Sequence, residues 1–216
     1  MDADCTLRIT DYVSRMNIMT GPMLSQPTFM KDAPLPEDVP LLTGEDLFAM
    51  GEIEWTELVN GRLIRMSPTG YTHGYIESNF AALLRNFVNQ HQLGQVLVGE
   101  VGIYTRRNPD TVRGADVAYV SNERLAQITS RSYLDVAPEL IVEILSPDDR
   151  WSDVMEKVDE YFAIGVQMVW IADPQRQQVF VYHSPTAVER FTLNDQLPGG
   201  TVLPGFQVAV AEVFGT

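Results

Sequence analysis

Cysteine is almost absent from this chain of 216 residues, which contains Cys5 alone. A single thiol cannot form an intrachain disulfide, and no group of cysteine and histidine residues has the spacing of a zinc site. Because proteins of oxidising compartments commonly rely on disulfides, the composition favours a reducing compartment. We therefore expect a cytoplasmic protein.

Long hydrophobic runs are absent as well. No apolar run approaches the roughly 18 residues that a membrane-spanning helix requires. The N-terminal stretch MDADCTLRITDYVSRMNIMT is too polar for a secretory signal peptide. We expect a soluble protein without a membrane partner.

Positive charge is scarce, since the formal net charge is -14. Attachment to duplex nucleic acid over a whole protein surface depends on clustered lysine and arginine, so this composition argues against it. Any contact with nucleic acid must be local. Lysine is especially rare, with Lys31 and Lys157 only, so the position of Lys157 is informative.

The chain divides into an N-terminal extension and one domain. Residues 1–40 include the proline-rich stretch APLPEDVP and show no sustained period, which predicts a loosely ordered extension. Residues 41–216 are long enough for a single domain with one core. Apolar spacing predicts helices over 71–91 and 152–165, with Ser152 as a cap and Gly residues at the ends. Strands are expected over 95–105, 114–120, 139–145, 167–173 and 178–183, with a hairpin at Asn60-Gly61 and short strands over 188–214. This order predicts an α/β domain with a mixed sheet.

Glu143 stands in the middle of the aliphatic run LIVEIL. Side chains alternate along a strand, and both faces of this run are apolar, which predicts a central strand. An ionised carboxylate removed from water needs a partner. That partner is either an arginine, such as Arg113 or Arg150, or a bound cation.

Asp116 and Lys157 raise the same question. Asp116 is the one charged residue in GADVAYV, and helical projection places Lys157 at the edge of an apolar arc that faces the sheet. Each has an ordinary explanation, since Asp116 can bond to backbone amides and Lys157 can cover apolar surface with its stem. With Glu143, however, the three residues favour a site for a hard divalent cation with an ammonium beside it.

The motifs from Leu41 to Val210 resemble those of the Uma-two family of endonucleases, a branch of the PD-(D/E)XK superfamily. The resemblance depends on ELVNGRLIRMSP, His73-Gly74, GADVAYV, ELIVEILSPDD and KVDEY followed by GVQMVWIAD. It implies a restriction-endonuclease-like αβββαβ core, a mixed β-sheet flanked by helices, with an N-terminal β-hairpin and extra C-terminal strands. Two positions depart from the superfamily pattern: Ala115 replaces a proline, and Leu145 stands where a lysine is usual. The basic residue is accordingly expected on the next helix, as Lys157.

The resemblance implies a Mg²⁺-dependent endonuclease that hydrolyses DNA phosphodiester bonds, with Mn²⁺ as a substitute ion. Asp116, Glu143 and the backbone carbonyl of Ile144 would bind the ion. Lys157 would position or help to deprotonate the attacking water. Enzymes of this size that cut both strands often pair, which suggests a homodimer.

Five further residues are weaker candidates for the site. Arg106, Arg107 and Arg113 form the basic cluster TRRNPDTVR and are expected to contact DNA phosphates, although a solvated hairpin loop explains them equally well. Glu57 is expected to complete the acid cluster, or else to form a cross-strand salt bridge. His73 is expected to orient water or phosphate, or to bond to a neighbouring loop.

Two other functions remain open. A nuclease fold that has become an inactive binding or assembly module would suit the acidic composition, but it gives no reason to retain two acids and an inward lysine. A pair of carboxylates can also hydrolyse glycosides, but that chemistry leaves Lys157 without a role.

Overall fold

The computed structural model describes residues 6–11, 40–51 and 56–216. The chain forms two compact units, Met1–Pro68 with Arg106–Val112, and Thr69–Thr105 with Arg113–Thr216. Most of the predicted extension over residues 1–40 lies outside the described residues. Its loose order, and the single domain over residues 41–216, stay predictions.

The smaller unit contains the predicted hairpin. Strands β1 (Thr56–Val59) and β2 (Arg62–Arg65) pair antiparallel. They are joined by Asn60 and Gly61, whose φ angles are 51° and 73°. Two successive positive φ values are typical of the tight turn that Asn-Gly favours, so the hairpin prediction is confirmed.

A short capped helix, α2 (Gly44–Ala49), belongs to the same unit. The Thr43 hydroxyl accepts a hydrogen bond from the Asp46 amide, and the Asp46 carboxylate accepts one from the Thr43 amide. These reciprocal bonds satisfy two amides that the first helical turn would otherwise leave without partners.

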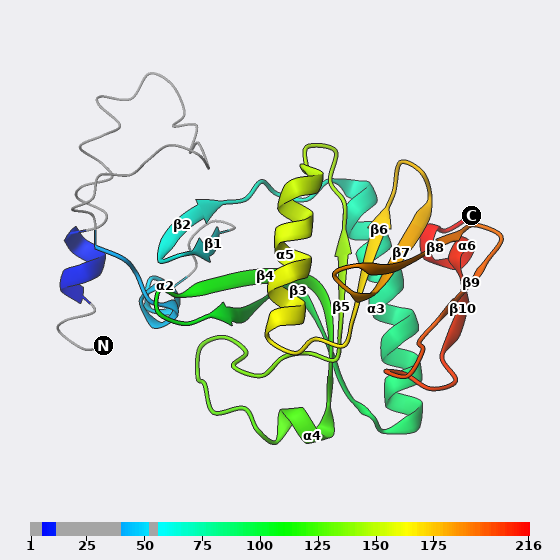
Figure 1. The fold of residues 1–216 in the computed structure, drawn as a ribbon, viewed down its shortest axis with the longest axis horizontal. Coiled ribbons are helices and arrows are strands. Elements are labelled where there is room, and N and C mark those ends of the chain that lie inside the picture. The colour runs from blue at the N-terminus through cyan, green and yellow to red at the C-terminus, as the bar shows by residue number, and fades with distance from the viewer. Residues whose placement is uncertain (1–5, 12–39, 52–55) are drawn as a thin grey trace. The chain divides into compact units, whose positions relative to one another are not determined.

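The larger unit is built on a mixed β-sheet (Figure 1). Strand β3 pairs with β4, and β4, β5, β6, β7 and β8 follow in spatial order. Strands β5 and β6 are parallel, whereas β4–β5, β6–β7 and β7–β8 are antiparallel. The bounds are β3 (Gly94–Arg106), β4 (Thr111–Ser121), β5 (Leu140–Ile144), β6 (Met168–Asp173), β7 (Gln178–Ser184) and β8 (Ala187–Thr192), and β9 (Gln196–Pro198) pairs separately with β10 (Gln207–Ala209).

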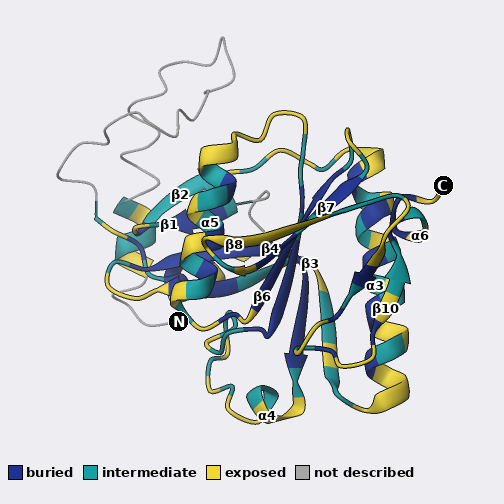
Figure 2. Ribbon diagram, turned by 45° about the vertical axis from the view of Figure 1, so that its right-hand side comes forward, coloured by how far each residue is buried: buried dark blue, intermediate teal, exposed yellow. Residues whose placement is uncertain are grey.

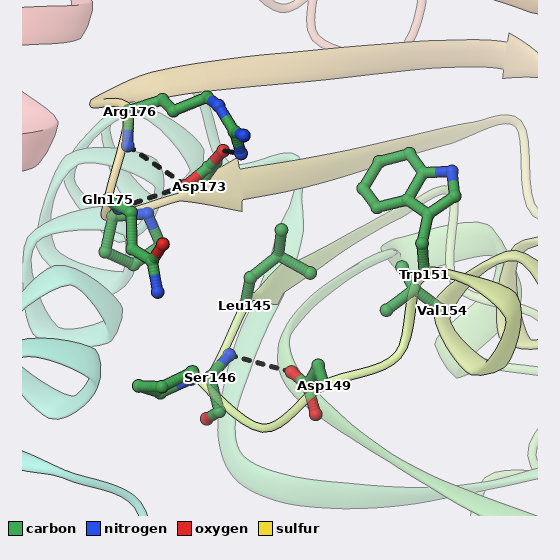
Figure 3. Close-up of a pocket in the computed structure, with 10 residues that line it drawn as sticks. Leu145, Ser146, Asp149, Trp151, Val154, Asp173, Gln175 and Arg176 are labelled. Carbon is green, nitrogen blue, oxygen red and sulfur yellow. Dashed lines mark hydrogen bonds and ion pairs between the residues drawn. The ribbon is translucent and has the colours of Figure 1, made fainter.

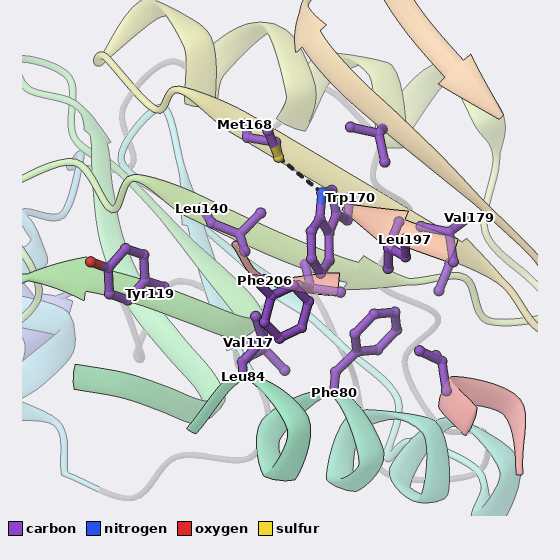
Figure 4. Packing of buried hydrophobic residues seen from close by; sticks show 14 of the residues in the cluster. Phe80, Leu84, Val117, Tyr119, Leu140, Met168, Trp170, Val179, Leu197 and Phe206 are labelled. Atoms are coloured by element: carbon purple, nitrogen blue, oxygen red, sulfur yellow. Dashed lines mark hydrogen bonds between the residues drawn. The ribbon is translucent and has the colours of Figure 1, made fainter. Parts of the chain in front are cut away.

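Two long helices cover opposite faces of this sheet. Phe80 of α3 (Tyr71–His91) packs in a core that contains Val142. Figure 4 shows Phe80 beside Trp170 in this core. Val158 of α5 (Trp151–Ala163) packs in a second core with Ile141. Because Ile141 and Val142 are neighbours on β5, their side chains point to opposite faces. The strands between the helices are therefore buried on both sides (Figure 2).

The helix ends differ in detail from the sequence prediction. Helix α5 begins at Trp151, and Arg150 at its N-cap makes no side-chain capping bond, so the prediction of Ser152 as the cap is wrong. The left-handed residue after α3 is Gln92, at φ 54°, and not the glycine at position 94. Two short helices, α4 (Asn122–Leu125) and α6 (Val210–Phe214), were not predicted. No helix among the described residues has the length and apolar composition to cross a bilayer.

Candidate active site

Glu143 faces helix α5, and its carboxylate contacts two side chains from that helix. The Tyr161 hydroxyl donates to Oε1 at 2.6 Å, and the Lys157 ammonium lies 3.4 Å from Oε2. Lys157 also donates to the Gly114 carbonyl at 3.3 Å. The inward orientation predicted for Lys157 is thus observed. Tyr161 was not among the predicted site residues, although its spacing of four residues from Lys157 places both on one side of a helix.

Asp116 lies on the neighbouring strand and is 4% exposed. Its Oδ2 accepts a hydrogen bond of 2.6 Å from the Ile144 amide and lies 3.3 Å from His73 Nε2. The bond to Ile144 ties the carboxylate to the end of the strand that carries Glu143. The backbone amide that was expected as an ordinary partner of Asp116 is therefore present. Asp116 also contacts a histidine from α3.

His73 and Glu77 bring a second group of ligands to Asp116. Within the described part of the chain, these three residues are the one group of at least three His, Cys, Asp or Glu residues whose ligand atoms all lie within 4.8 Å of one another. Glu77 Oε1 also accepts from the Gly99 amide at 3.2 Å. His73 was predicted as a weaker candidate. Glu77, which follows His73 by one helical turn on the same side of the helix, was not among the predicted site residues.

Glu100 is a further acid of this region. A Cβ atom built on Gly114 would lie 2.6 Å from Glu100 Oε2, so this carboxylate packs directly over the Gly114 backbone. Glu100 and Gly99 have φ angles of 56° and 88°, which interrupt the regular strand. This irregular backbone turns an acid toward Gly114, whose carbonyl Lys157 contacts.

The pKa shifts agree with an excess of negative charge around Asp116. Burial by itself lowers the pKa of the His73 imidazole, but the hydrogen bond to Asp116 and the charges of Asp116, Glu77 and Glu100 outweigh it and raise the pKa. Burial raises the pKa of Glu77, and the charge of Asp116 raises it further. An electrostatic environment of this kind favours the binding of a cation.

Arg113 does not lie at the surface, because its side chain is 2% exposed. Its Nε and Nη2 donate to the two oxygens of Glu160 at 2.7 and 2.8 Å. Phosphate binding by Arg113 would require this bidentate ion pair to open, and the contact with DNA stays a prediction.

The remaining predicted residues belong to the smaller unit. Glu57 is a buried residue of β1, in register with Ile64 of β2. Arg106 donates to Asn60 Oδ1 at 2.7 Å, and Arg107 pairs with Glu45 at 3.0 Å. Their roles in catalysis and DNA binding stay predictions.

A separate pocket lies beyond the carboxyl end of β5 (Figure 3). Its two acids already bond to nearby backbone amides: Asp149 accepts from Ser146 at 2.7 Å, and Asp173 accepts from Arg176 at 3.1 Å. Both carboxylates therefore stabilise their own turns. The pocket is lined by Leu145, Ser146, Pro147, Asp149, Trp151, Val154, Asp173, Pro174, Gln175 and Arg176.

The sequence of this chain matches a known protein family over the region that contains the motifs described above. The sequence profile of Uma2, described as "Putative restriction endonuclease", matches residues 45–211. The chain belongs to the Uma2 family. The resemblance to Uma-two proteins is thereby confirmed, and the matched span includes every predicted site residue from Glu57 to Lys157.

The structural comparison confirms the fold. A crystal structure from Anabaena variabilis ATCC 29413, entitled as that of "a putative nuclease belonging to DUF820", superposes with a TM-score of 0.68. The match covers 81% of this chain and 98% of that chain, at 21% sequence identity. No protein of curated function matches the chain. Uma2 membership supports a nuclease role. The structural match shows a shared α/β fold, a mixed sheet flanked by helices.

Proposed function

We propose that this protein is a Mg²⁺-dependent endonuclease that hydrolyses phosphodiester bonds of DNA. The observation that carries the proposal is the contact of Lys157 with Glu143, on the strand whose Ile144 amide binds Asp116. The buried Asp116, the half-buried Glu143 and one of the two lysines of the chain come together at adjacent strands. Apolar residues at these positions would avoid the desolvation free energy of buried charges, so stability alone does not explain the charged residues.

The residues suit a hard divalent cation. Carboxylate and carbonyl oxygens are the ligands that Mg²⁺ and Mn²⁺ accept, and the raised pKa of His73 is a sign that the acids around it attract positive charge. Asp116, Glu143 and the Ile144 carbonyl would hold the ion. When bound, such an ion lowers the pKa of a coordinated water and neutralises charge on the phosphate.

The side chains of α5 have separate tasks in this proposal. Lys157, held by Gly114 and Glu143, presents an ammonium to the attacking water or to a phosphate oxygen. Tyr161 fixes the orientation of the Glu143 carboxylate through its bond of 2.6 Å. Both residues act from one rigid helix, which favours a defined geometry of the reacting groups.

DNA binding would be local, because the net charge is -14. Arg106 and Arg107 are exposed and remain candidates for phosphate contacts. Pairing of two copies as a homodimer would allow cleavage of both strands. A cytoplasmic location, which the scarcity of cysteine favours, would agree with a DNA substrate.

Plasmid cleavage in Mg²⁺ tests the proposal, with Lys157→Met as the decisive variant. Methionine keeps most of the apolar stem but removes the ammonium, and we expect the cleavage rate to fall by about 100-fold or more. Asp159→Asn is the matched control, because Asp159 is an exposed acid of the same helix. It should cleave at the wild-type rate.

Failure of the wild-type protein to cleave single- or double-stranded DNA with Mg²⁺ or Mn²⁺, combined with no cation binding in calorimetry, would refute the proposal. A nuclease fold that serves as a binding or assembly module would then explain the acidic composition better. Unchanged cleavage in the Lys157 variant would refute the role of the ammonium alone.

A further inference from the structure

The contacts of Glu143 with α5 do not account for the side chains that α3 brings to Asp116. His73, Glu77 and Asp116 offer one nitrogen and two carboxylate ligands, all within 4.8 Å of one another. A transition metal holds such ligands at about 2.0–2.2 Å, so two of them stand about 3 Å apart at a right angle and about 4.2 Å apart at most. Small rotations of the side chains would close this set around one ion.

The imidazole of His73 is the group whose contacts point to an ion. Its Nε2 lies 3.3 Å from Asp116 Oδ2, longer than the roughly 2.7–2.9 Å of a charge-assisted hydrogen bond but close to the spacing of two ligands on one metal. Its Nδ1 is buried without a hydrogen-bond partner, in a side chain that is 7% exposed. Buried polar atoms are rarely left unsatisfied in native proteins. Nε2 therefore faces Asp116, where it can serve as the ligand atom, and Nδ1 points away from Asp116 and has no hydrogen-bond partner among the described residues.

We infer that His73, Glu77 and Asp116 form a second cation position, which shares Asp116 with the Mg²⁺ position and selects a divalent transition metal. Imidazole nitrogen suits transition metals, whereas Mg²⁺ keeps oxygen ligands and water. Phosphodiester hydrolases with two ions hold them about 3.5–4 Å apart, a separation that one shared carboxylate can bridge. The part of this ion in DNA cleavage rests on the proposed function, whereas its binding does not.

Binding of Mn²⁺ and Mg²⁺ to the full-length protein, without DNA, tests the inference by calorimetry and by electron paramagnetic resonance of Mn²⁺. Wild-type protein should bind Mn²⁺ more tightly than Mg²⁺, with nitrogen coupling in the resonance spectrum. His73→Ala should weaken Mn²⁺ at this position by at least about tenfold, as expected when a ligand is lost, and should abolish the nitrogen coupling. Mg²⁺ affinity should change much less, because Mg²⁺ does not depend on the imidazole.

Glu77→Gln is a second, milder variant, since Glu77 is only half-buried and the replacement keeps its shape. It should weaken Mn²⁺ binding but retain nitrogen coupling. His91→Ala is the matched control: His91 is an exposed histidine of the same helix, whose Nδ1 contacts the Phe87 carbonyl. It should bind both ions like the wild-type protein.

Unchanged Mn²⁺ affinity in both the His73 and the Glu77 variants, or wild-type spectra without nitrogen coupling, would overturn the inference. The proposed nuclease function can fail separately. A protein that binds Mn²⁺ through His73 yet cleaves no DNA supports the ion position and refutes the nuclease. A protein that cleaves DNA but binds Mn²⁺ without His73 supports the nuclease and refutes the second ion position.

Discussion

The buried ion pair between Arg113 and Glu160 gives the sharpest prediction for stability. Arg113 on β4 is 2% exposed and Glu160 on α5 is 12% exposed, and two hydrogen bonds of 2.7 and 2.8 Å join them. Thr105 of β3 donates a third bond to Glu160, of 2.9 Å. The pair therefore attaches α5, and with it Lys157, to the sheet.

Glu160→Gln removes the negative charge and keeps the shape of the side chain. Arg113 then stays buried with its charge, and Glu156, 3.5 Å away and 49% exposed, is a weaker partner. Removal of one member of a buried pair costs about 3–5 kcal/mol in the free energy of unfolding. Because Glu156 remains and glutamine keeps an acceptor for Thr105, we expect the low end, about 3 kcal/mol.

Urea denaturation measures this loss through the fluorescence of Trp170, which is fully buried in the same unit. The control is Glu156→Gln, which changes an exposed partner of the same arginine and should cost less than about 1 kcal/mol. A loss below about 1 kcal/mol for Glu160→Gln, or equal losses in the two variants, would show that the pair does not stabilise α5.

Three further predictions follow from the larger unit. Tyr161→Phe removes one donor to the Glu143 carboxylate, and we expect a loss of about 2 kcal/mol in unfolding free energy. Because Tyr161 orients a proposed ion ligand, DNA cleavage should slow and ion affinity should fall; wild-type cleavage with wild-type ion affinity would contradict this. Gly102→Ala places a methyl group against the ring of Tyr133 and should lower the free energy of unfolding by about 1–3 kcal/mol, measured by heat or urea. Gly74→Ala is the control, because no atom lies near its Cβ; it should stabilise α3 by roughly 0.5–1 kcal/mol. Burial raises the pKa of Tyr133 to about 12, above the value of about 10 in an unfolded chain. The stability that the neutral Tyr133 side chain contributes is therefore complete below pH 10 and is lost as the pH rises toward 12. In Tyr133→Phe, the free energy of unfolding should depend less on pH over this range.

Local patterns in the sequence predicted most of the elements that surround the site. Helical periodicity predicted α3 from Tyr71 to His91, and the Asn-Gly pair predicted the hairpin. The alternation of LIVEIL placed Glu143 in a buried strand, and helical projection turned Lys157 toward the sheet. These features depend on side-chain spacing within one segment, so the sequence alone was sufficient to predict them.

The sequence could not decide which side chains meet across segments. Arg113 was a possible partner of Glu143 or of DNA, but the structure pairs it with Glu160, 47 residues away. His73 reaches Asp116 because α3 packs on one face of the sheet, while α5 brings Lys157 from the other. Periodicity identifies the face on which a residue lies, but strand register and helix packing determine its partner. The composition and spacing of the chain therefore determined the fold and the candidate acids, and only the tertiary structure decided how their charges are paired.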